Sequence, residues 1–167
     1  SGSITSPLVA GAVFPRSWPH LVPADSPTTF YCHLKDSRAN GKVVPGLLGS
    51  VSRMLQMAGE GGMVKLITAG DGFLRVEAVS GRTDPKGNPF PGHGSFENVP
   101  IHDSRGINTE FKAGFTSTLA DTLKAMNADE LSLSLNKANT PMVLEAINNG
   151  GGWGMKVLVL PEMLPNY

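Results

Sequence analysis

The sequence predicts an α+β fold made of two copies of one unit, each a strand, a helix and two further strands. Residues 111–146 contain the whole unit in one uninterrupted run. Residues 29–78 repeat the same order of patterns, and the copies end on similar tripeptides, VEA at 76–78 and LEA at 144–146. Recurrence of one set of elements within a chain indicates an internal duplication.

The later copy gives the clearest pattern. Its helix carries Leu119, Leu123 and Met126 at helical spacing, the hydroxyls of residues 116–118 stand where an N-cap is needed, and Asp121 is expected in the first turn. Alternating apolar residues mark strands before and after this helix. We therefore expect strands at 111–115, 131–136 and 142–146 and a helix that stops at 127–129.

The earlier copy has a helix of the same kind. An apolar stripe runs from Val44 to Ala58, with Pro45 tolerated in its first turn and with Ser50, Arg53 and Gln56 on the opposite, polar face. Strands are expected at 29–34, 63–68, 73–78 and 96–101, and the apolar run of the last strand, at 153–160, is typical of burial on both faces. Prolines at 15, 19 and 23 make residues 1–27 an extended arm.

The composition is that of a globular protein without a strong charge. Lys plus Arg and Asp plus Glu number 14 each, so the formal net charge is zero and a polycation is excluded. The one cysteine, Cys32, lies in a strand-like run, which predicts a small buried residue in a reducing compartment. No apolar run approaches the roughly 18 residues that span a bilayer.

The domain organisation follows from the repeat. Residues 8–167 are expected to form a single domain, with copies at approximately 28–101 and 108–160. Residues 1–7 are expected to be a linker, because the opening Ser-Gly-Ser is typical of residues added by cloning rather than of a signal peptide.

No motif with catalytic spacing is present. The sequence has no phosphate-binding loop, no HExxH and no CxxC. His93 and His102 flank a predicted strand and could meet at a metal ion, but isolated loop histidines are more often solvated. We therefore expect no catalytic residue, no metal site and no cofactor. An enzyme that uses His93 or His102 is the alternative.

A set of short motifs is more specific than this overall pattern. They are GFTSTLADTLKAM at 114–126, DELSLSL at 129–135 and TPMVL at 140–144, together with FP at 14–15 and a last strand that runs into LPEML at 160–164. In this order they resemble the C-terminal third of the bacterial sliding clamp, the beta subunit of DNA polymerase III, over residues 8–165. The resemblance implies a DNA-clamp-like domain of two pseudo-symmetric β-α-β-β-β units, with its sheets outside and its two helices side by side on one face.

In such a clamp the helices line the inner wall of a ring. The resemblance implies that Arg53 and Lys124 face the phosphates of encircled duplex DNA, through contacts that are independent of sequence and sensitive to salt. It places Leu55 and Gln56, at the end of the first helix, near the contact with another clamp subunit. Other clamp domains would close the ring, and the protein would act in the bacterial cytoplasm at the nucleoid.

The resemblance also implies a hydrophobic cleft for short linear peptides of DNA polymerases, the clamp loader and repair proteins. The matching positions are Pro15, His20, Leu21, Asn139, Pro141, Leu158, Val159, Leu160, Pro161, Glu162, Met163 and Leu164. Leu158 and Leu160 would equally be core residues in any protein that ends on a buried strand, so groove and core both stay open.

The sequence departs from the clamp pattern at the tail and in the loop at 80–93, which is longer than is usual. Glu162 stands where the family usually has an apolar residue, and Met163 stands where it usually has arginine. A purely structural or assembly role with a degenerate cleft is therefore the alternative function. The family subunit carries two preceding domains, so we expect either an excised C-terminal domain or a divergent short homologue.

Overall fold

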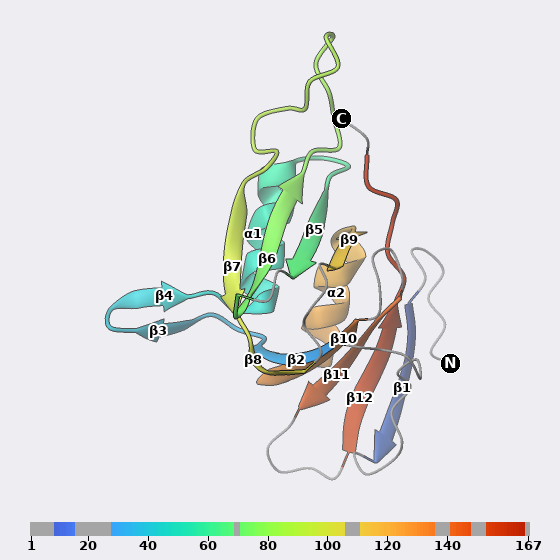
Figure 1. The fold of residues 1–167 in the computed structure, drawn as a ribbon. Helices are drawn as coiled ribbons and strands as arrows, with labels where there is room; N and C mark the ends of the chain where they lie inside the picture. The colour runs from blue at the N-terminus through green and yellow to red at the C-terminus, as the bar shows by residue number, and fades with distance from the viewer. Residues whose placement is uncertain are drawn as a thin grey trace.

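The structure is a computed structural model that describes residues 9–15, 28–68, 71–105, 111–135, 141–147 and 153–165. Figure 1 shows its elements in chain order: β1 (Val9–Pro15), β2 (Thr28–His33), β3 (Ser37–Ala39), β4 (Lys42–Val44), α1 (Leu47–Ala58), β5 (Met63–Thr68), β6 (Phe73–Val79), β7 (Phe96–Pro100), β8 (His102–Arg105), β9 (Phe111–Phe115), α2 (Ser117–Met126), β10 (Glu130–Leu135), β11 (Met142–Ile147) and β12 (Trp153–Val159).

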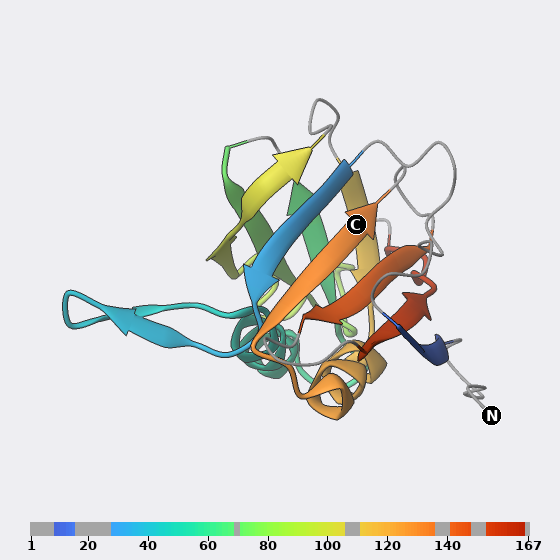
Figure 2. The same ribbon diagram turned by 90° about the horizontal axis from the view of Figure 1, so that it is seen from below.

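Two antiparallel sheets contain most of the strands. One has the order β1-β12-β11-β10-β2-β8 and the other the order β7-β6-β5-β9, while β3 and β4 form a separate hairpin. Figure 2 shows α1 and α2 next to each other on one side of the molecule, with the two sheets on the other side. The predicted α+β class, with two β-α-β-β-β units and both helices on one face, is confirmed.

The first strand of each unit belongs to the sheet of the other unit. β2 pairs with β10, where Phe30 lies opposite Leu133, and β9 pairs with β5, where Ala113 lies opposite Leu66. All four of these side chains are completely buried and belong to one hydrophobic cluster. The exchange therefore joins both units around a single core.

Both helices bury the predicted apolar stripe. On α2, Leu119, Leu123 and Met126 are at most 5% exposed, as expected. Asn127 ends this helix in the left-handed conformation, which also agrees with the prediction. Two details of α2 differ. Thr116 is the N-cap but its hydroxyl makes no capping hydrogen bond, and Asp121 lies beyond the first turn because the helix begins only at Ser117.

The predictions for α1 were wrong at two places. The helix begins at Leu47 with Gly46 as its N-cap, so the preceding residues Val44 and Pro45 are outside it. Ser50, predicted on the polar face, is completely buried and donates a hydrogen bond of 2.8 Å to Glu97 Oε1. A carboxylate on β7 thus supplies the partner that allows a hydroxyl to be buried here.

Burial along the last strands also differs from expectation. Ser132 and Ser134 alternate with the apolar residues of β10, yet they are only 9% and 5% exposed, with β2 and β11 on either side of this strand. The last strand was expected to be buried on both faces. Leu158 is 36% exposed, but Val157, Val159 and Lys156, the last on the same face as Leu158, are at most 4% exposed, so the prediction fails at Leu158. Cys32 is completely buried, as predicted, and burial raises the pKa of its thiol.

No strand was predicted at β8 or in the β3–β4 hairpin, and β1 lies in the segment that was expected to be an extended arm. The β3–β4 hairpin turns through Asn40 and Gly41, both at positive φ (54° and 77°), which is the backbone that Asn-Gly turns favour. Its three-residue strands lack a run of alternating apolar residues, so no pattern in the sequence predicts them.

No helix among the described residues is long and apolar enough to cross a membrane.

The loop between β6 and β7 has an ordered structure of its own. Asp84 Oδ1 accepts hydrogen bonds from the backbone N–H groups of Lys86 and Asn88, each at 2.9 Å. Near its end, Gly92 has a φ of 100°, and its backbone lies so close to Met57 O at the end of α1 that a Cβ would overlap this oxygen. This loop is therefore packed against α1.

Gly92→Ala should destabilise the protein more than Gly87→Ala. Both residues have positive φ, which costs an alanine about 1–2 kcal/mol, but nothing lies within 4 Å of a Cβ at Gly87. The overlap with Met57 O should add about 1–3 kcal/mol at Gly92. Urea unfolding of both variants measures the difference. Equal losses of stability would show that the loop does not pack on α1.

Candidate functional site

The chain after β12 crosses from the six-stranded sheet to the edge of the four-stranded sheet. There Glu162 forms an antiparallel bridge with Gly114 of β9, and its N–H donates to Gly114 O at 2.7 Å. A methyl group at Gly114 would lie 2.6 Å from Leu164 Cδ2 and 2.9 Å from Met63 Sδ. The glycine at 114 thus leaves the space that the ends of the Leu164 and Met63 side chains occupy beside the tail, residues 160–165.

The structure brings part of the predicted cleft together. Leu160, Pro161, Glu162 and Leu164 are partly buried along the tail, whereas Met163 is 90% exposed. Pro141 is near them, because the next residue, Met142, pairs with Val159 at the start of the tail.

Other predicted cleft residues are not part of this group. Val159 is a core residue. Pro15 pairs with Trp153, at the end of β12 that is farthest from the tail. His20, Leu21 and Asn139 lie outside the described residues.

Sequence reasoning missed two residues beneath the tail. Met63 begins β5, and Gly114 lies inside β9, next to the tail backbone. A glycine inside a strand often marks the close approach of another backbone, so Gly114 could have been found from the sequence. Just after β9, the hydroxyl of Thr116 is buried without a hydrogen-bond partner. Met63 has no comparable signal, because it reads as an ordinary strand residue.

The two residues predicted to face DNA have different surroundings. Lys124 is exposed in the last turn of α2. Arg53 on α1 instead forms a fork with Glu97, with both hydrogen bonds at 2.7 Å, and donates to Asp36 Oδ2 at 2.6 Å and Oδ1 at 3.2 Å. Two carboxylates thus compensate the charge of Arg53. Of the two residues predicted to face DNA, only Lys124 remains as an exposed cation.

The carboxylate of Asp36 also serves the start of α1. It accepts the backbone N–H of Gly46 at 2.8 Å, and Gly49 leaves room for it, since a Cβ there would overlap the Asp36 carboxylate. Gly46 has no side chain to cap the helix, and Leu34 O accepts the first-turn N–H of Leu48 at 2.9 Å, while Asp36 places a negative charge at the positive end of α1. Because Asp36 directly precedes β3, this contact also fixes the base of the β3–β4 hairpin.

These contacts shift the titration of all three groups. Hydrogen bonds from Arg53 hold the pKa of the Asp36 and Glu97 carboxyls below their usual values, against the opposing effect of partial burial. Hydrogen bonds to Glu97 and Asp36 raise the pKa of Arg53. The network joins α1, β7 and the segment before β3.

The residues predicted at a subunit contact lie at the end of α1. Leu55 is partly buried and Gln56 is exposed. Their neighbour Met57 is 46% exposed. An apolar side chain is therefore available at this edge, although a second chain at Leu55 and Gln56 remains a prediction.

The two histidines considered for a metal site do not meet. His93 Nδ1 accepts the N–H of Ser80 in the loop before β7, at 3.1 Å. His102, on β8 at the other end of β7, contacts Glu130 and stacks on Tyr31. No group of three His, Cys, Asp or Glu side chains in the described part of the chain is arranged to hold a metal ion.

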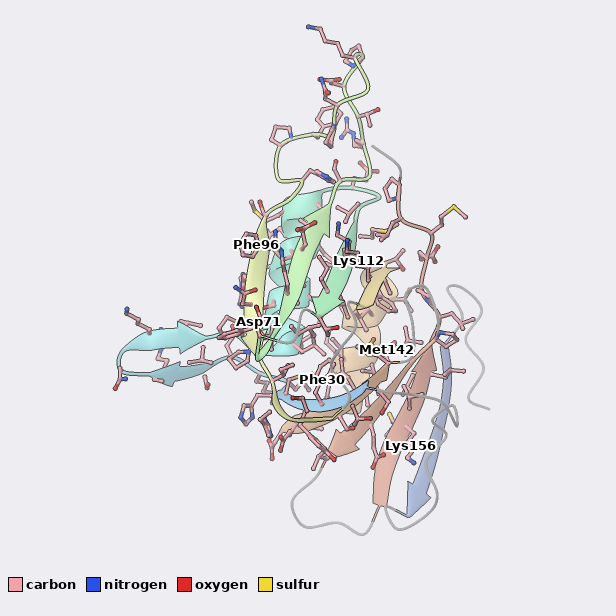
Figure 3. The ribbon with its side chains drawn as sticks, viewed as in Figure 1. Phe30, Asp71, Phe96, Lys112, Met142 and Lys156 are labelled. Carbon is pink, nitrogen blue, oxygen red and sulfur yellow. The ribbon has the colours of Figure 1, made fainter. Side chains whose placement is uncertain are left out.

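A hollow of about 570 Å³ lies on the outer face of the four-stranded sheet. Figure 3 labels three of its lining residues, Asp71, Phe96 and Lys112. Its charges are largely paired within the molecule. Glu77 contacts Lys65 at 3.0 Å and Arg75 at 2.8 Å, and the Arg75 guanidinium lies 3.7 Å above the Phe96 ring. Burial raises the pKa of Glu77, but its two cationic partners outweigh burial and lower it.

No protein-family model and no curated protein matches the chain by sequence. Several solved structures are similar to it. The DNA polymerase sliding clamp of Bacillus subtilis superposes with a TM-score of 0.60 and 20% identity, covering 89% of this chain and 34% of the clamp. The DNA polymerase III subunit beta of Pseudomonas aeruginosa superposes with a TM-score of 0.60 and 18% identity, covering 86% of this chain and 33% of that subunit. The beta subunit of Thermotoga maritima superposes with a TM-score of 0.59 and 16% identity, covering 87% of this chain and 33% of that subunit.

These similarities establish the fold. The chain has the fold of a sliding-clamp domain, which confirms the fold that the resemblance implied. It spans about a third of the length of each of these clamps.

Replacing Arg53 with Gln should lower the free energy of unfolding at neutral pH by about 1 kcal/mol, a small value because the three side chains are partly exposed and screened. The lowered carboxyl pKa values stabilise the fold above the unfolded values of about 4, and this stabilisation is lost as the pH falls through the folded values. The variant should therefore show a shallower loss of stability below about pH 4.

Urea unfolding over a pH series measures this effect. Arg53→Lys is the control, because it keeps the charge but not the fork, and it should give an intermediate result. An acid limb as steep in Arg53→Gln as in the wild type would show that Arg53 does not cause the lowered pKa values.

Proposed function

We propose that the chain is a non-enzymatic processivity-clamp domain that captures short linear peptides at its tail and, within a ring, helps to encircle duplex DNA. The observation that carries this proposal is the sliding-clamp fold together with a tail that lies on β9 and exposes an apolar side chain, Met163. The partners would be peptides of DNA polymerases, the clamp loader and repair proteins, in the bacterial cytoplasm at the nucleoid.

The case for peptide capture is physical. Met163 is 90% exposed and Leu158 is 36% exposed, on either side of the partly buried residues 160–162. The bridge between Glu162 and Gly114 holds the tail backbone in place, so little ordering entropy would be lost when a peptide binds. A fixed apolar surface of this kind suits the Leu and Phe side chains of an extended peptide.

The case for encircling DNA depends on the ring. Both helices lie on one face, as the inner wall of a ring requires, and Lys124 is exposed there. The chain covers about a third of the clamps it is similar to, so a ring would require further clamp domains. We propose that the end of α1, with Leu55 and Gln56, contacts one of them.

Titration with a fluorescent peptide of the form Gln-x-x-Leu-Phe tests the peptide site. The wild type should bind saturably, and Met163→Asp should weaken binding by at least about tenfold, because it places a charge on the exposed apolar surface. Met57→Asp is the matched control. It makes the same change at an exposed methionine on α1, and it should bind the peptide as the wild type does.

Two results would contradict the peptide site. One is equal weakening by Met163→Asp and Met57→Asp, which would mean that the peptide binds nonspecifically. The other is the absence of saturable binding by the wild type at high micromolar concentration. In that case a structural or assembly role, with a degenerate cleft that contains Glu162, would be the better account.

A further inference from the structure

The β3–β4 hairpin leaves the body of the protein at the level of the helices. Figure 2 shows it extending sideways from the end of the helix layer, away from the sheets. Residues 35–43 are all exposed, including both strands except Val44. A two-stranded hairpin with no buried face gains little from packing, so stability of the fold does not explain its presence.

The hairpin carries an uncompensated positive charge. Lys35, Arg38 and Lys42 are exposed cations within eight residues, and Asp36 is the only carboxylate of residues 35–44. Asp36 is already occupied by Arg53 and by the N–H of Gly46. The three cations are therefore available to a polyanion.

The same network gives the hairpin a fixed base. Asp36, immediately before β3, is held by Arg53 on α1, and Glu97 on β7 holds Arg53 in turn. At the other end of the hairpin, β4 leads through Pro45 and Gly46 directly into α1. The start of α1, the first helix of the proposed inner wall, therefore sets the direction of the hairpin.

We propose that the β3–β4 hairpin is a contact for the phosphates of duplex DNA, made by Lys35, Arg38 and Lys42 beyond the area that the two helices cover. This inference rests on the proposed function, because the helix face must be the one that meets DNA. Cations on an extended hairpin bind phosphates independently of sequence and strongly dependent on salt. The hairpin has one exposed large apolar side chain, Val43, so its surface suits a polyanion better than an apolar protein partner.

Fluorescence anisotropy of a labelled mixed-sequence duplex, titrated with the chain over a series of NaCl concentrations, tests this contact. The double variant Arg38→Gln, Lys42→Gln should weaken binding at low salt by at least about fivefold and reduce the slope of log K against log salt by about 1.8, or about 0.9 for each lost phosphate contact. Both side chains are exposed, so thermal melting should show an unchanged fold.

The loop between β6 and β7 provides a matched control. Arg82→Gln, Lys86→Gln removes the same two kinds of charge from exposed positions of a loop that lies at the opposite end of α1 from the hairpin (Figure 1). This variant should keep the wild-type slope. An equal loss in both variants, a loss in neither, or no binding by the wild type at low salt would each overturn the proposal.

The peptide titration separates this inference from the proposed function. The hairpin variant should bind the Gln-x-x-Leu-Phe peptide as the wild type does, because the tail lies on β9 and not on the hairpin. A chain that binds peptide normally but shows no hairpin effect on DNA would refute the hairpin contact and leave the clamp assignment in place.

Discussion

The exchange of first strands between the two units is the constraint on which the rest of this structure depends. β2 belongs to the first unit in sequence but is hydrogen-bonded to β10 of the second unit. In the same way, β9 belongs to the second unit but is hydrogen-bonded to β5 of the first. Neither unit can complete its sheet alone, so the two fold around one core. The exchange also brings α1 against α2. A single face with two helices is therefore a consequence of strand pairing.

Ion pairs within the molecule then determine which positive charges this helix face exposes. Arg53 is placed on α1 where a DNA contact was expected, yet it is already paired with two carboxylates, those of Asp36 and Glu97. Its charge holds β7 and the base of the hairpin against the helix. Exposed cations with no carboxylate of their own lie instead on the neighbouring hairpin. A residue whose type and position fit a binding role can thus serve instead to hold elements of the fold together.

The sequence predicted the elements with strong periodicity and missed those without it. Leu119, Leu123 and Met126 identified α2 because burial imposes helical spacing on apolar residues. The β3–β4 hairpin has no buried face, so no such spacing exists, although Asn40–Gly41 does mark its turn. Partners distant in sequence were also missed. Ser50 was assigned to the polar face of α1, because its hydrogen-bond partner, Glu97, is distant in sequence. The tail residues were predicted, and so was β9 as a strand, but the contact between them was not.

The chain makes the same kind of connection at two places, β8 onto β2 and the tail onto β9, but different side chains surround each connection. After the last strand of each unit, the chain crosses back to that unit's own first strand, which lies at the edge of the other sheet or within it: β8, after β7, pairs with β2, and the tail, after β12, meets β9. At β2 the crossing segment contributes a side chain that contacts its neighbours, because His102 stacks on Tyr31 and contacts Glu130. On β9 the crossing is a single bridge opposite a glycine, and the side chain that follows, Met163, points into solvent. Two equivalent crossings therefore give one candidate peptide site, and the difference lies in which side chains the first strand contributes.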